Sequence, residues 1–133
     1  MFEAEAVQCT RVVAVAAALD AARWIRGSVV LRTAPDEAVV VGGGLEWIGD
    51  EHAIVVDDSG WAQIRLDPSD LQLAMKRLAA WPAPQEGFGQ GMVAEIAAKV
   101  WVEGAGNGWF LVGRSVLADF QERLTAALEG TGA

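Results

Sequence analysis

Apolar and polar residues alternate most clearly in the middle of the chain, where the pattern predicts two strands. Ile54–Val56 and Trp61–Leu66 are short runs of the apolar, β-branched and aromatic residues that favour strands. Between them, Asp57-Asp58-Ser59-Gly60 has the composition of a turn. We therefore expect these two runs to form a β-hairpin.

A helix is predicted directly after this hairpin. Asp67 is a suitable N-cap, and Pro68 suits the first helical position, where no hydrogen-bonded N–H is needed. The apolar residues then recur at helical spacing and define one buried face: Leu71, Ala74, Met75 and Leu78. The residue before a proline resists helical geometry, so the helix should end before Trp81-Pro82.

The last part of the chain shows a similar order of elements. Residues 83–91 contain Pro84 and three glycines, so we expect a loop. A strand is predicted from Met92 to Glu103, followed by a Gly-rich turn and a returning strand over 109–112. Ser115 is the expected cap of a final helix, whose core face would be Leu117, Phe120, Leu124 and Leu128.

The first third of the chain is partly ambiguous. Residues 8–15 fit either a β-branched strand or the start of a helix, and we expect a strand followed by a helix that ends at Gly27. Two further strands are predicted over 29–33 and 38–41, since Ala34-Pro35-Asp36-Glu37 between them is typical of a turn. Gly42-Gly43-Gly44 then ends this hairpin.

Together these elements indicate an α+β fold in one domain over residues 1–133. We expect an antiparallel or mixed sheet, built from ferredoxin-like βαββ pieces and covered by two or three helices. The apolar fraction of 53% excludes a disordered chain, and no apolar run approaches the roughly 18 residues that a membrane helix needs.

Charge and cysteine content restrict the function classes. A net charge of −8 disfavours nucleic acid and anionic membranes as partners. Cys9 is the single cysteine and has no internal disulfide partner, while the acidic start with Glu3 and Glu5 does not fit a signal peptide. These features favour a cytoplasmic location.

No set of residues in the sequence predicts a catalytic or metal centre. Gly42-Gly43-Gly44 lacks the spacing of a phosphate-binding loop, and Gly113-Arg114-Ser115 lacks the second glycine of a hydrolase nucleophile turn. His52 has acidic neighbours but no second histidine at ligand spacing. We therefore expect no catalytic and no metal-ligating residues.

The tryptophans are more informative, because the chain has six of them and no tyrosine. Strand alternation places Trp61 and Arg65 on the face opposite Ala62, Ile64 and Leu66. By the same alternation, Trp101 shares a face with Lys99 and Glu103. A large aromatic side chain among charges on a sheet face suggests a protein interface, although helices that cover this face are the alternative.

Three segments carry a resemblance to a known family: LRTAPDEAVVVG over 31–42, AIVVDDSGWAQIRLDPSDLQLAMKRL over 53–78, and WFLVGRSVLADFQERL over 109–124. They resemble the γ subunit of heterotetrameric sarcosine oxidase and, more distantly, the folate-binding domain of the glycine-cleavage T-protein. The T-protein pattern has an acidic pair where this chain has Ala94 and Glu95, and its serine turn carries a histidine where Gly60 stands here. The resemblance thus implies a scaffold without the aminomethyltransferase carboxylate.

We consequently expect a non-catalytic subunit or interaction module with no cofactor. Its partner would be a flavin-dependent amine oxidase subunit or a second copy of the chain, and Trp61, Arg65, Trp101 and Glu95 are the predicted binding residues. One alternative is a small-molecule module that binds a folate-like ligand, with Glu95 on a polar ring edge and residues 85–91 as a lid. The other is an acidic, immunity-type protein that neutralises a basic partner.

Overall fold

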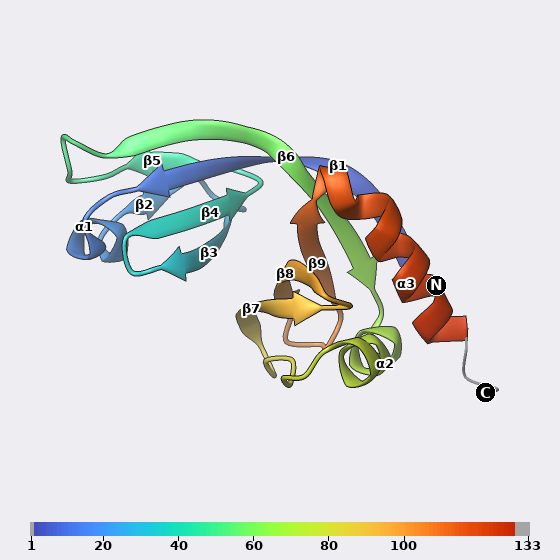
Figure 1. Cartoon of the computed structure of the whole chain (residues 1–133). Helices are drawn as coiled ribbons and strands as arrows, with labels where there is room; N and C mark the ends of the chain where they lie inside the picture. Colours follow the sequence, from blue (N-terminus) through green and yellow to red (C-terminus); the bar gives the residue numbers. More distant parts are fainter. Residues whose placement is uncertain (1, 130–133) are drawn as a thin grey trace. The chain divides into compact units, whose positions relative to one another are not determined.

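The computed structural model describes residues 2–129 and is mainly an antiparallel β structure (Figure 1). Seven strands are hydrogen-bonded in the order β3-β4-β1-β6-β9-β8-β7. The described chain divides into two compact units. Unit 1 comprises residues 2–6 and 60–129, unit 2 comprises Val7–Ser59, and the long strands β1 and β6 contribute residues to both. The prediction of one domain over residues 1–133 extends beyond the described residues and stays a prediction.

Unit 2 is built around a hairpin that pairs with β1. The elements that it contains or shares are β1 (Phe2–Val13), α1 (Ala16–Asp20), β2 (Arg23–Trp24), β3 (Val29–Ala34), β4 (Glu37–Val41), β5 (Leu45–Trp47) and β6 (Ile54–Leu66). Strand β4 pairs antiparallel with β3 and with β1, while β2 and β5 form a separate small sheet. The predicted hairpin with its turn at Pro35-Asp36 is therefore confirmed.

The N-terminal strand and the helix that follows it are confirmed, but the expected end of that helix at Gly27 is wrong. Helix α1 ends at Asp20, and the chain continues as β2, which pairs with β5. The side chain of Arg32 donates to Asp20 Oδ1 at 2.8 Å and to the Ala16 carbonyl at 3.2 Å, so that it ties both ends of the short helix to β3. Only Ala18 and Leu19 of α1 are buried, which leaves too little apolar surface to support a longer helix.

A carboxylate organises the approach to α1. Asp50 accepts hydrogen bonds from the backbone N–H groups of Val15 and His52, at 3.0 Å and 2.9 Å. These two bonds stabilise the charged carboxylate and lower the pKa of Asp50 below its ordinary value. Asp50, one of the acidic residues near His52, therefore has a local role in the loop of unit 2.

The hairpin expected around Asp57–Gly60 is also wrong, because Ile54–Leu66 forms the single strand β6. Strand β1 lies beside β6 in the sheet, and the pairing of two long strands overrides the local turn preference of Asp-Asp-Ser-Gly. The C-terminal part of β6 pairs antiparallel with β9, from Trp61 opposite Gly113 to Leu66 opposite Gly108.

Besides its parts of β1 and β6, the described part of unit 1 contains two α-helices, one 3-10 helix and three strands: α2 (Pro68–Leu78), β7 (Gly87–Val93), β8 (Ile96–Val102), β9 (Gly108–Gly113), the 3-10 helix η1 (Arg114–Val116) and α3 (Leu117–Glu129). Helix α2 begins as predicted, since Asp67 Oδ1 accepts the N–H of Asp70 at 2.8 Å. This bond and the hydroxyl of Ser69 lower the pKa of Asp67. Helix α3 differs from the prediction, because Ser115 lies in η1 and does not cap it.

The strand expected over 92–103 is two strands, and part of the expected loop is regular structure. Gly87–Val93 pairs with Ile96–Val102 through seven residues, and the reversal at Ala94-Glu95 is a two-residue turn. Residues 87–91 read as a loop because three of the five are glycine. They form a strand because their backbone groups pair with β8, although glycine itself does not favour strands.

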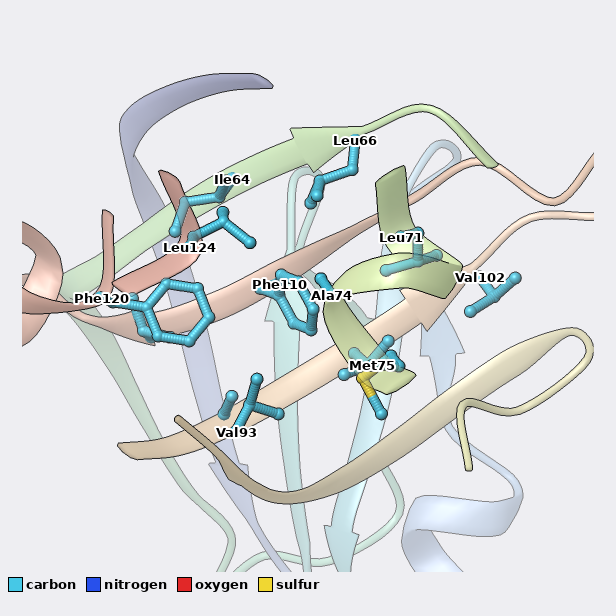
Figure 2. Packing of buried hydrophobic residues seen from close by; sticks show 13 residues of the cluster. Ile64, Leu66, Leu71, Ala74, Met75, Val93, Val102, Phe110, Phe120 and Leu124 are labelled. Carbon is cyan, nitrogen blue, oxygen red and sulfur yellow. The ribbon is translucent and has the colours of Figure 1, made fainter. Parts of the chain in front are cut away.

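The core of unit 1 lies between one face of its sheet and the helices α2 and α3 (Figure 2). Phe110 of β9 meets Phe120 of α3 edge to face, with ring centroids 5.3 Å apart. Ile64 and Leu66 of β6 belong to the same cluster, as do Val100 and Val102 of β8. The inward faces of β6, β8 and α2 are thus those that the sequence predicts.

Candidate functional site

The predicted aromatic positions lie on the sheet face opposite the helices of unit 1. Trp61 and Arg65 alternate on β6 with the core residues, and Trp101 does the same on β8. Trp61 and Trp101 are half-buried, and Arg65 is exposed. The same face also carries Gln63, Trp109 and Leu111, which are buried. Helices α2 and α3 therefore do not cover the two predicted tryptophans.

One group on this face is an aromatic ladder across neighbouring strands. Trp101 is the cross-strand partner of both Phe88 on β7 and Trp109 on β9. The indoles of Trp101 and Trp109 are stacked, with centroids 6.4 Å apart and an angle of 27° between their planes. Arg65 continues the row opposite Trp109, and its Nε lies 3.8 Å from the carboxylate of Glu5.

A second group forms a pocket of about 420 Å³ at the other end of the same strands. Trp61, Glu95 and Lys99 line it, together with Ile96, Ala97, Gly113 and Val116. The Nζ of Lys99 lies 4.5 Å from the centroid of the Trp61 ring, within the range of a cation–π interaction. The pocket thus combines an aromatic surface, a cation and a carboxylate.

Glu95 reaches this pocket from a strained turn. Ala94 and Glu95 have φ angles of 53° and 64°, the left-handed region in which non-glycine residues are rare. The turn is fixed from both helices: the N–H of Ala94 donates to the carbonyl of Leu78 at 2.7 Å, and Arg123 donates to the carbonyl of Ala94. Backbone strain held by surrounding contacts is a feature of binding sites.

The structure therefore separates the four predicted residues into two groups. Trp61 and Glu95 share the pocket, whereas Trp101 and Arg65 belong to the aromatic ladder. Sequence reasoning did not select Lys99, although alternation on β8 already placed it on the same face as Trp101. Phe88 and Trp109 were missed because their strand registers are not visible from the chain alone.

This arrangement is suited to recognition. An indole with a nearby ammonium and carboxylate offers a flat apolar surface and both signs of charge to a partner or ligand. Among residues 2–129, no three histidine, cysteine or acidic side chains gather in a way that could hold a metal ion. Within that same range, no helix has the length and hydropathy to cross a membrane.

No protein-family model and no curated protein matches this sequence. The fold, however, matches a chain in the structure titled heterotetrameric sarcosine oxidase from Corynebacterium sp. U-96 in complex with pyrrole 2-carboxylate. The TM-score is 0.73 at 21% sequence identity, over 100% of this chain and 85% of the other. This chain has a sarcosine oxidase subunit-like fold. The resemblance stated from the sequence is confirmed for the fold, and the more distant link to the T-protein stays a prediction.

Proposed function

We propose that this chain is a non-catalytic subunit of a sarcosine-oxidase-like complex, similar in role to the γ subunit. The fold match over the whole chain to a component of a heterotetramer carries the proposal. The replacement of the T-protein acidic pair by Ala94 and Glu95 supports a structural role over aminomethyl transfer. The partner would be a larger flavin-dependent amine oxidase subunit.

Exposed apolar side chains in unit 2 support a protein partner. Among residues 2–129, the large apolar residues with exposed side chains are, apart from Met92, all in this unit: Val15, Ile25, Trp47, Ile54, Val55 and Val56. Three of them are consecutive on β6, with exposed fractions of 59%, 47% and 46%. Successive strand residues point to opposite faces, so both faces of this segment present apolar surface. Such exposure is typical of interaction sites.

Affinity purification of the tagged chain from its native host tests the proposal. We expect a larger flavin-containing protein to co-purify, identified by its visible absorbance spectrum and by mass spectrometry. Recovery of the chain alone, or only of a tight homodimer, would contradict the subunit role. The homodimer named among the predicted partners is thus an outcome of the same experiment.

A paired substitution locates the interface. Ile54→Lys with Val56→Lys puts two charges on one face of β6 and should abolish co-purification without changing the thermal midpoint, since both side chains are exposed. The control is Ala126→Lys, an exposed apolar-to-lysine change on α3. If both variants co-purify with the partner to the same extent, the interface does not include this face of β6.

A folate-like ligand is a second candidate, favoured by the pocket that Trp61, Glu95 and Lys99 line. An indole suits a pterin ring, and Lys99 suits a carboxylate. Saturating folate should raise the stability of the protein by a few kcal/mol if it binds the folded state alone. The measurement is a thermal shift with the wild type and Trp61→Ala, and the absence of a shift in the wild type excludes this ligand.

A further inference from the structure

A larger pocket, of about 680 Å³, lies elsewhere in unit 1, between α2 and the connection that follows it. Leu71 and Met75 of α2 and Val102 of β8 contribute side chains that are almost fully buried. Trp81 and Pro82 belong to the connection and also line the pocket. The volume falls within the roughly 300–1,000 Å³ that is usual for small-molecule sites.

The aromatic wall of this pocket is fixed in place. The Nε1 of Trp81 donates to the carbonyl of Met92 at 3.0 Å. The indole lies against β7 where the strand has glycines, since a Cβ on Gly89 or Gly91 would come within 3.1 Å or 2.6 Å of the Trp81 ring. Ala79 forms a β-bridge with Val93, which secures the start of the connection. The pocket is therefore built before any ligand arrives, which lowers the entropic cost of binding.

The charge in this pocket is of one sign. Lys76 is the one charged side chain among the described residues that line it, and the remaining polar side chains are the amides of Gln72 and Gln85. Within residues 2–129, no carboxylate lies within 4.0 Å of the Lys76 ammonium. An apolar pocket that carries an ammonium and no acid favours an anionic ligand over a neutral one, even in a chain with a net charge of −8.

We propose that this pocket binds a small aromatic monocarboxylate. The ring of the ligand packs between Trp81 and the apolar side chains of α2, and its carboxylate pairs with the ammonium of Lys76. The amides of Gln72 and Gln85 supply further hydrogen bonds at the rim. This site is separate from the Trp61 pocket, and the proposal does not depend on the subunit role.

Titration with 1-naphthylacetate and its uncharged analogue 1-naphthylacetamide tests the proposal. Binding is followed by calorimetry and by the NMR signal of the Trp81 indole N–H, which reports from the pocket itself. We expect the acid to bind about threefold to fivefold more tightly than the amide, the range of a solvent-exposed ion pair. Added salt should reduce this difference, because it screens the pair.

Lys76→Gln should lower the affinity for the acid by the same factor and leave the amide unchanged. Lys76→Arg should keep the preference, and Arg26→Gln is the matched control, since it removes one exposed cation from unit 2. Each of the following affinity results overturns the proposal: no binding of either probe at millimolar concentration, equal binding of acid and amide, or a preference for the acid that survives Lys76→Gln. A Trp81 signal that does not move while the probe binds also overturns it.

Discussion

Replacing Glu95 by glycine should stabilise the protein, although glycine usually destabilises strands and helices. Glu95 has a φ of 64°, and the left-handed region costs a residue with a Cβ roughly 1–2 kcal/mol. Glycine avoids that cost but loses about 0.5–1 kcal/mol more chain entropy on folding. The net gain therefore lies between roughly 0 and 1.5 kcal/mol, with a central value of about 0.75 kcal/mol, or about 3 °C in thermal midpoint.

The assay is urea unfolding of three variants measured against the wild type. Glu122→Gly is the matched control: the same substitution in the interior of α3, at an exposed position, should lower the free energy of unfolding by roughly 0.5 kcal/mol. Glu95→Gln keeps the strain but removes the charge, and its stability should be unchanged. If Glu95→Gly is no more stable than the wild type, the turn is not strained and the argument for a built site at Glu95 fails.

The contribution of Glu95 to binding is measured with the same variants. Glu95→Gln and Glu95→Gly should weaken any ligand or partner of the Trp61 pocket alike, because both remove the carboxylate. Only the glycine variant should gain stability. The effect of Glu95 on stability and its effect on binding are thus separated within one set of proteins.

Three further outcomes are expected. Gly91→Ala puts a Cβ 2.6 Å from the Trp81 indole and should lower the free energy of unfolding in urea by roughly 1–3 kcal/mol. The control is Gly104→Ala, whose Cβ would meet its nearest atom at 3.6 Å and should change this free energy by less than about 0.5 kcal/mol. Phe120→Ala removes a fully buried ring and should cost about 3–5 kcal/mol by that measurement. The lowered pKa of Asp67 means that its contribution is present above the ordinary value of 3.8 and is lost as the pH falls through the lower, folded-state pKa. Thermal midpoints between about pH 5 and pH 2 should therefore fall less steeply for Asp67→Asn, which keeps a capping side chain, than for the wild type; equal slopes would contradict this.

The elements that the sequence predicts well are those defined by neighbouring residues. Helix α2 has its cap, its proline and its apolar spacing within one short segment, and all three are used as expected. The β3–β4 hairpin is defined by its own turn, with Pro35 in position. In both cases the local preferences and the tertiary structure agree.

The elements that the sequence does not predict depend on contacts with distant parts of the chain. Asp57–Gly60 has the composition of a turn, but it lies within β6 because β1 runs beside that strand in the sheet. The real turn at Ala94-Glu95 has no glycine or asparagine to mark it, and Leu78 and Arg123 hold it. The Trp61–Lys99 contact could not be predicted from the sequence for the same reason. It joins two strands, β6 and β8, that are not adjacent in the sheet.

The division of the chain has a consequence for biosynthesis. Residues 2–6 belong to unit 1 together with residues 60–129, so the whole of unit 2 is inserted between two parts of unit 1. A ribosome completes the inserted unit first, while Phe2 and Ala4, which pack against the unit 1 core, await partners that are still to be translated. The entropic cost of closing such a long insertion rises only slowly with its length, and prior folding of the insert brings its ends together. Residues 2–6 therefore emerge before the rest of unit 1 and are among the last residues of these two units to reach their final place.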